Sequence, residues 1–188
     1  MSMCNHCKKL EAKIILTYEQ ETQHLCFRCY NKMMEEELGM ELESQPDSFS
    51  VTDFAVVSRS FVITSRLNPM GIYLEAEENN TEDGYKFAVY GELDCNQSEL
   101  FNQLLNKVMR GVSKSYLTIT AFPNGQQIES IVEDKVIGRL DYDETNEDTP
   151  LVIVDGKAYT WEQLGRMVST FEGFQFQLKM VDMTDDVE

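Results

Sequence analysis

Hydrophobic and polar residues alternate along much of the chain beyond residue 48, the period expected of strands with one buried face. Stretches rich in Val, Ile, Phe and Thr predict strands at 48–57, 59–67, 71–78, 85–93, 116–122, 127–134, 136–143 and 174–183. The polar, turn-forming stretch 78–84 indicates a hairpin connection between two of them. The sequence "LVIVDGKAYT" predicts a tight hairpin over 151–160, because Asp155 and Gly156 suit the positive φ angles of a two-residue turn.

Apolar residues recur at helical spacing in two segments of this region. Asn96 is a candidate cap, with Glu99 three residues later, and Thr160 stands in the same relation to Gln163. The first helix is expected to bury one face, formed by Phe101, Leu104, Leu105, Val108 and Val112. The second is expected to bury Trp161, Leu164, Val168 and Phe171 and to stop at Gly173.

A separate module is expected at the N-terminus. After Cys29 the segment "YNKMMEEEL" favours a helix that stops at Gly39, and the aperiodic stretch around Pro46 reads as a linker. We therefore predict an α+β protein: a small zinc ribbon or knuckle at 1–38, then an α+β domain at 48–188. This domain is expected to hold a mostly antiparallel sheet and two main helices. Its segments 48–118 and 119–188 follow a similar order of elements, which is consistent with an internal duplication.

The N-terminal module carries the strongest chemical signal in the sequence. Cys4, Cys7, Cys26 and Cys29 form the pattern C-x2-C-x18-C-x2-C, a spacing typical of four-cysteine zinc sites. Two residues between ligands let one turn direct both sulfurs to the same ion. The 18-residue loop is long enough for a short hairpin. We expect the fifth cysteine, Cys95, to be a small packing residue.

Four thiolates fill a tetrahedron, so the zinc would be structural rather than catalytic. His6 and His24 lie in the same module and either could replace one cysteine as a ligand. A redox-active pair and an iron–sulfur cluster are further alternatives, although two matched pairs favour shared ligation of zinc.

Composition changes the picture chiefly through charge. The chain of 188 residues has a formal net charge of -17. Its first 32 residues hold five basic and three acidic side chains, a net of +2, which leaves -19 for the remainder. The basic residues are Lys8, Lys9, Lys13, Arg28 and Lys32. They either balance the charge of the thiolates or contact a partner, and the acidic remainder disfavours nucleic acid.

The sequence predicts neither a membrane location nor a known catalytic centre. The stretch "MSMCNHCKK" lacks the apolar core of a signal peptide, and no segment approaches about 18 consecutive apolar residues. We expect a cytoplasmic protein. There is no glycine-rich phosphate loop or nucleophile elbow, and both histidines lie beside the cysteines. We assign no catalytic and no cofactor-binding residues other than the four metal ligands.

Two motifs resemble a family of uncharacterised bacterial proteins. The N-terminal "CNHC…HLCFRCYNKMMEEELG" is similar to that family's zinc-ribbon-type module, and "PLVIVDGKAYTWEQLGRMVSTFEGFQF" to its C-terminal signature. Together they span about a third of the chain. The family has no established activity, so the resemblance implies zinc binding and a bacterial, cytoplasmic setting, and transfers no catalytic residue.

The leading hypothesis is a non-catalytic interaction or regulatory protein with structural zinc and a protein partner. The alternatives are a nucleic-acid-binding protein acting through the weakly basic module, and an enzyme with a pocket in the α+β domain. The sequence does not specify the oligomeric state.

Overall fold

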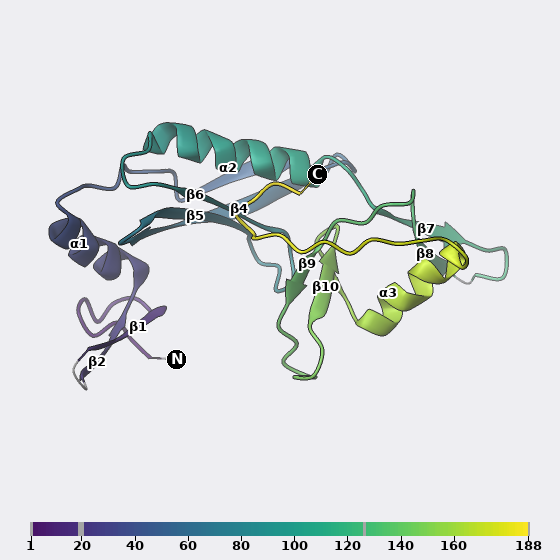
Figure 1. Cartoon of the computed structure of the whole chain (residues 1–188), viewed down its shortest axis with the longest axis horizontal. Coiled ribbons are helices and arrows are strands. Elements are labelled where there is room, and N and C mark those ends of the chain that lie inside the picture. Colours follow the sequence, from purple (N-terminus) through teal and green to yellow (C-terminus); the bar gives the residue numbers. More distant parts are fainter. Residues whose placement is uncertain (1, 19–20, 126, 188) are drawn as a thin grey trace.

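The computed structural model describes residues 2–18, 21–125 and 127–187. Its N-terminal module consists of a hairpin, β1 (Ile14–Tyr18) and β2 (Glu21–Leu25), followed by α1 (Phe27–Leu38) (Figure 1). The helix ends where predicted, because Gly39 adopts a left-handed conformation with φ 66° and donates its N–H to Glu35.

The central element is a four-stranded antiparallel sheet whose strands follow each other in chain order. It contains β3 (Ser48–Thr52), β4 (Ser58–Asn68), β5 (Gly71–Glu78) and β6 (Lys86–Gly91). The helix α2 (Gln97–Val112) covers one face of this sheet, and α1 packs near the opposite end of β4 (Figure 1). The polar stretch 79–85 connects β5 to β6, as the sequence predicted.

Strand alternation determines which face of this sheet is buried. Phe61 and Leu67 of β4 and Ile72 and Leu74 of β5 lie in one core with α2. The helix buries Leu100, Leu104, Val108 and Val112. Its face is thus shifted from the predicted one, since Leu100 replaces Phe101 and Leu105, which are only half-buried.

The C-terminal part forms a smaller unit with its own core. It contains β7 (Leu117–Ala121), β8 (Gln127–Ile131), β9 (Arg139–Asp141), β10 (Leu151–Val154), β11 (Lys157–Tyr159), α3 (Trp161–Val168) and a 3-10 turn, η1 (Ser169–Phe171). β7 and β8 pair with each other, and a second sheet has the order β11-β10-β9. Val152, Val154, Tyr159 and Met167 form the core.

The start of α3 follows the prediction better than its end, which comes at Val168 before the 3-10 turn, or its buried face. Thr160 and Gln163 form the expected capping box. The buried residue, however, is Met167, while Trp161 and Val168 are exposed. The prediction of this face was wrong in part: Leu164 packs against the core as expected, but Met167 is buried there in place of Trp161 and Val168.

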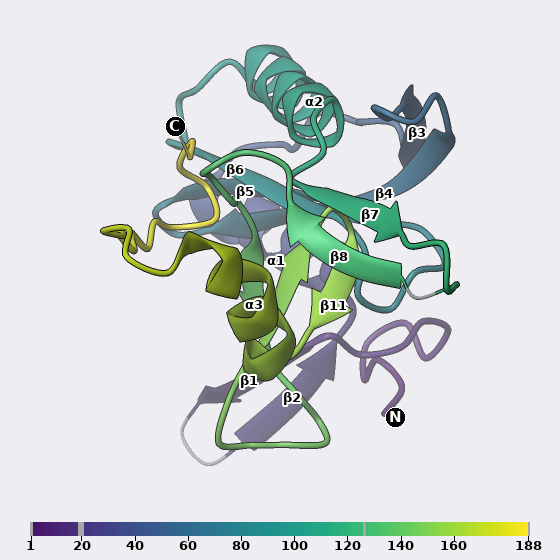
Figure 2. The same cartoon turned by 90° about the vertical axis from the view of Figure 1, so that its right-hand side faces the viewer.

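The predicted strand at 174–183 is absent. These residues form an extended segment without ladder partners, which crosses the outside of the molecule towards α2 (Figures 1 and 2). The α+β class with antiparallel pairing is confirmed, and in the described ranges the strands divide among four small sheets. The predicted boundary at 118 falls within β7; before this strand the body holds one four-stranded sheet, and from it onward the described residues hold two smaller ones.

Candidate metal centre

The four cysteines of the N-terminal module come together at the junction of three local structures. Cys4 and Cys7 occupy the turn before β1, Cys26 is the residue that precedes α1, and Cys29 lies in the first turn of that helix. The hairpin β1–β2 brings the second pair back to the first. The backbone secures this return, because Asn5 N–H donates to His24 O at 2.7 Å and His24 N–H donates to Asn5 Oδ1 at 2.6 Å.

The distances between the sulfurs fit a tetrahedral metal ion. All four Sγ atoms lie within 4.8 Å of one another. Cys7 Sγ and Cys26 Sγ are 3.8 Å apart. Zinc–sulfur bonds of about 2.3 Å in a tetrahedron place neighbouring sulfurs about 3.8 Å apart, whereas a disulfide needs about 2 Å. The cluster is therefore spaced to hold one ion.

Electrostatics support the same conclusion. Burial raises the pKa of the Cys4 thiol, but the backbone N–H groups of Cys26, Cys7 and His6 outweigh it and lower the pKa to about 6. Burial and the neighbouring thiols raise the pKa of Cys29 to about 12. Four thiolates in one small volume repel each other, and a divalent cation removes that conflict.

Neither histidine belongs to the cluster of potential ligands found among the described residues. His24 lies on β2, where its Nδ1 is 3.3 Å from Ser2 Oγ, and His6 is exposed. Ligation by the four cysteines alone stays a prediction.

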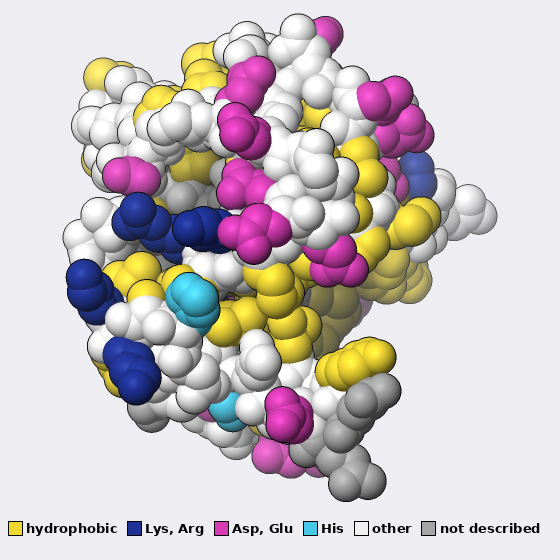
Figure 3. Space-filling model, turned by 90° about the vertical axis from the view of Figure 1, so that its left-hand side faces the viewer, with side chains coloured by type: hydrophobic (Ala, Val, Ile, Leu, Met, Phe, Trp, Pro, Cys, Tyr) yellow, Lys and Arg dark blue, Asp and Glu magenta, His cyan; other side chains and the backbone are white. Residues whose placement is uncertain are grey.

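The basic residues of the module point to solvent. Lys8, Lys9 and Arg28 are exposed and form no ion pair with any residue in the described ranges. The principal causes of the shifted thiol pKa values are burial, backbone N–H groups and other thiols, not these cations. Several Lys and Arg side chains gather on this end of the molecule together with the histidines (Figure 3).

The N-terminal module packs directly against the central sheet and is not joined to it by a flexible linker alone. Cys4, Cys26 and Tyr30 belong to the same buried cluster as Leu67 and Ile72 of the central sheet. The segment predicted as a linker is also fixed: Glu43 N–H donates to Gln97 Oε1, and Gln97 Nε2 donates to Glu41 O.

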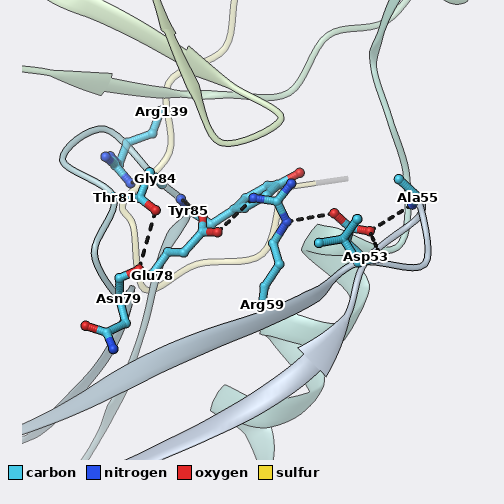
Figure 4. Close-up of polar contacts among 10 residues, drawn as sticks. Asp53, Ala55, Arg59, Glu78, Asn79, Thr81, Gly84, Tyr85 and Arg139 are labelled. Carbon is cyan, nitrogen blue, oxygen red and sulfur yellow. Dashed lines mark hydrogen bonds and ion pairs between the residues drawn. The ribbon is translucent and has the colours of Figure 1, made fainter.

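A second polar cluster, missed by sequence reasoning, lies inside the body (Figure 4). Arg59 Nε donates to Asp53 Oδ2 and Arg59 Nη1 to Glu78 Oε1, each at 2.7 Å. The N–H groups of Ala55 and Val57 both donate to the other oxygen of Asp53. Asp53 and Glu78 look like ordinary surface acids in the sequence, and no local pattern shows that Arg59 pairs with both.

This cluster adjoins the contact between the central sheet and the C-terminal unit. The Arg59 guanidinium lies 5.3 Å from the centre of the Tyr85 ring, and Tyr85 N–H donates to Glu78 Oε2. Gly156 packs so closely on that ring that an added Cβ would lie 2.8 Å from it. Because the carboxylates and the guanidinium satisfy one another, we interpret the cluster as structural.

Two hollows lie on the surface of the body. One is formed by the acidic loop around Asp143 and Pro150, and the other by α2, β6 and the C-terminal tail. Both are open to solvent. In the described part of the chain, no helix has the length and apolar character needed to cross a membrane.

Comparison with known families divides the chain into three consecutive matches. Residues 3–41 match "Domain of unknown function (DUF7685)", residues 43–113 match "Domain of unknown function (DUF7686)" and residues 116–185 match "Domain of unknown function (DUF7713)". The comparisons find no significant match among curated proteins or solved structures. The first match encloses the four cysteines, so the candidate metal centre lies within one family unit.

Proposed function

We propose that this chain is a non-catalytic interaction protein whose N-terminal module is held together by structural zinc, bound by Cys4, Cys7, Cys26 and Cys29. The observation that carries the proposal is the convergence of four sulfurs within 4.8 Å at the spacing of a tetrahedral zinc site. With four thiolate ligands the ion has no open position for substrate or water. Its role is then to stabilise the surface that the module presents.

Metal analysis tests the site directly. Protein purified without added zinc is expected to contain one equivalent of zinc, with four thiols protected from titration until a chelator is added. Cys26→Ser should lose the metal, whereas Cys95→Ser, which changes the cysteine far from the cluster, should retain it. Less than about half an equivalent of zinc with freely titratable thiols would refute the site.

We propose a protein partner with an acidic contact surface for the exposed face of the module. Lys8, Lys9 and Arg28 are free to contact it, because they form no ion pair within the described residues. Pull-down from the native host with the full chain, compared with a Lys8→Glu/Lys9→Glu variant, should show which captured protein depends on this face. A partner set unchanged by the double variant would refute this surface.

Nucleic-acid binding through the same face is a second candidate, favoured by the gathering of basic side chains in Figure 3. The net charge of -17 opposes it. A salt-dependent affinity for DNA or RNA that disappears in the double variant would support this candidate over the first. An enzyme with a pocket in the α+β domain gains no support from the two open hollows.

We also propose that the chain is organised as a zinc-binding module at 1–38 and an α+β domain at 48–188, with 48–118 and 119–188 as its halves. The family matches support it, since they change at 41–43 and at 113–116. Free cysteines and the thiolate site suit a reducing, cytoplasmic compartment.

A further inference from the structure

The segment Phe174–Met180, here called the strap, has the sequence pattern of a strand but no partner strand in the described ranges. Its apolar residues stand at every second position, and all are exposed: Phe174 71%, Phe176 91%, Leu178 65% and Met180 60%. In an extended chain, residues two apart share one face, so these four side chains form an apolar stripe. Monomeric proteins seldom expose a continuous apolar stripe, and such a stripe often marks an interaction site.

The strap is held only at its ends. On the N-terminal side, Phe174 N–H donates to Phe171 O and the two rings pack edge to face with centroids 5.7 Å apart. Between Gln175 and Met180, no hydrogen bond or ion pair joins the strap to any residue of the described ranges. Its backbone N–H and C=O groups are thus available for a strand ladder.

The chain beyond the strap is fastened to α2. Lys107 Nζ donates to Met183 O at 2.8 Å and to Asp185 O at 2.6 Å, and Arg110 Nη2 donates to both carboxylate oxygens of Asp186. This tail lies beside Val89 and Tyr90 of β6. The two anchors hold the strap on the outside of the molecule, where it bulges away from the body (Figure 2).

Charge limits what can cover the strap. The strap contains one charged residue, Lys179, and no carboxylate, in a protein with a net charge of -17. Two copies of so acidic a chain repel each other over most of their surface. Within residues 174–180, two copies can approach closely without opposing carboxylates.

The strap is also complementary to itself. In an antiparallel pair centred on Gln177, Phe174 stands opposite Met180 and Phe176 opposite Leu178. In the same register Gln175 stands opposite Lys179, and Gln177 meets its own counterpart. All apolar side chains then share one face, and every opposed pair matches apolar with apolar or polar with polar.

We propose that the strap is a homodimerisation element, in which the straps of two copies pair as an antiparallel two-stranded ribbon around a two-fold axis at Gln177. A two-fold axis gives the closed, isologous contact that is most common among homo-oligomers. The ribbon pairs the backbone groups along one edge of each strap, and the opposed apolar side chains cover part of one another's surface. The strand that the alternating sequence predicts then has its partner strand in the second copy and not within its own chain.

Sedimentation of the zinc-loaded full chain, over concentrations up to about 0.1 mM, tests the proposal. The wild-type chain is expected to change from monomer to dimer within this range. Phe176→Asp with Leu178→Asp should weaken the dimer at least about tenfold, because it places like charges directly opposite each other in the ribbon. Gln175→Asp adds a charge of the same sign on the other face, opposite Lys179, and should leave the dimer unchanged or tighter.

Cross-linking tests the register. Gln177→Cys should form an intermolecular disulfide under mild oxidation, mapped by mass spectrometry to residue 177, because the two copies of this residue are directly opposed. Gln175→Cys should not, since its counterpart lies elsewhere. A wild-type monomer throughout the range, a dimer indifferent to the double Asp variant, or equal cross-linking at both positions would each overturn the proposal. Unchanged circular dichroism verifies that the variants are folded.

Discussion

Asn31 of α1 is hydrogen-bonded to the main chain of β4 at Leu67, although the two residues are 36 positions apart. Leu67 N–H donates to Asn31 Oδ1 at 3.0 Å, and Asn31 Nδ2 donates to Ser65 O at 2.8 Å. The side-chain amide thereby acts as a short piece of neighbouring strand. It joins the N-terminal module to the central sheet at a point where both share a buried core.

Asn31→Asp should loosen this junction. The carboxylate retains an acceptor for Leu67 but faces the carbonyl of Ser65 without a donor, so the folded protein loses about 1–3 kcal/mol. Urea unfolding of the zinc-loaded protein at neutral pH measures the loss. Asn102→Asp, the same change at an exposed position of α2, should alter stability by less than about 0.5 kcal/mol. Equal effects of the two changes would show that Asn31 does not hold the junction.

The Asp53–Arg59 ion pair predicts a pH dependence of stability. Burial alone would raise the pKa of Asp53, but the Val57 N–H, the Arg59 guanidinium and the Ala55 N–H hold it below the ordinary value of 3.8. A carboxyl whose folded pKa is lowered stabilises the fold above its unfolded pKa. That contribution disappears as the pH falls through the folded pKa.

Asp53→Asn should therefore cost stability at neutral pH, by about 2–4 kcal/mol because Arg59 loses a charged partner inside the protein. The difference from wild type should shrink progressively as the pH falls below about 4. Unfolding free energies at a series of pH values give this difference directly. Comparing the two proteins at each pH cancels the effect of acid on the four-cysteine cluster, which both proteins contain. Asp148→Asn, in the exposed acidic loop, should give only a small difference in unfolding free energy at neutral pH.

Local signals in the sequence predicted the ends of elements well. The cap at Asn96, the capping box of Thr160 with Gln163 and the stop at Gly39 are all present, because each depends on residues within one turn of the helix. The cysteine spacing likewise brought four sulfurs together through a hairpin that the intervening residues encode.

Interactions between distant segments could not be predicted in this way. The contact of Asn31 with β4 depends on how separately formed elements pack. The pairing of Arg59 with Glu78 depends on the register of the long hairpin formed by β4 and β5. The strap illustrates a second limitation of sequence patterns. Alternation indicates which side chains share a face, but it does not indicate whether a neighbouring strand is present. For α3, periodicity allowed two overlapping faces, and tertiary contacts selected the one with Met167.

Asp155 combines a turn with an anchor, and the two roles can be separated. Its φ of 51°, followed by 71° at Gly156, forms the predicted tight turn between β10 and β11. Its carboxylate also accepts hydrogen bonds from Ser115 Oγ and from the N–H groups of Tyr116 and Leu117. These bonds join the hairpin to the segment that follows α2.

Asp155→Gly keeps a residue suited to the turn and removes the carboxylate. We expect it to destabilise the protein by about 2–4 kcal/mol, since three donors lose a charged acceptor. Asn80→Gly is the matched control, because Asn80 has a φ of 59° in the turn after β5 and is exposed. It should be neutral or slightly stabilising in thermal unfolding. A neutral Asp155→Gly would assign the residue to the turn alone.

Lys8 tests whether the basic residues beside the cluster balance the thiolates. Lys8 adopts a left-handed φ of 54° directly after Cys7, where its N–H donates to Cys4 O at 3.0 Å. A residue with a Cβ costs about 1 kcal/mol in this conformation, and glycine removes that cost. We expect relief of this strain to outweigh the loss of the lysine charge. Lys8→Gly should then retain zinc about fivefold more tightly against a competing chelator.

Lys9→Gly removes the same charge from the next residue, which has no positive φ. It should retain zinc no better than wild type, because glycine adds conformational freedom to the unfolded chain and relieves no strain at this position. Tighter zinc in Lys8→Gly but not in Lys9→Gly would show that the backbone of the turn governs the site. Weaker zinc in both variants would instead show that the lysine charges stabilise the four thiolates, and would make their exposure to a partner secondary.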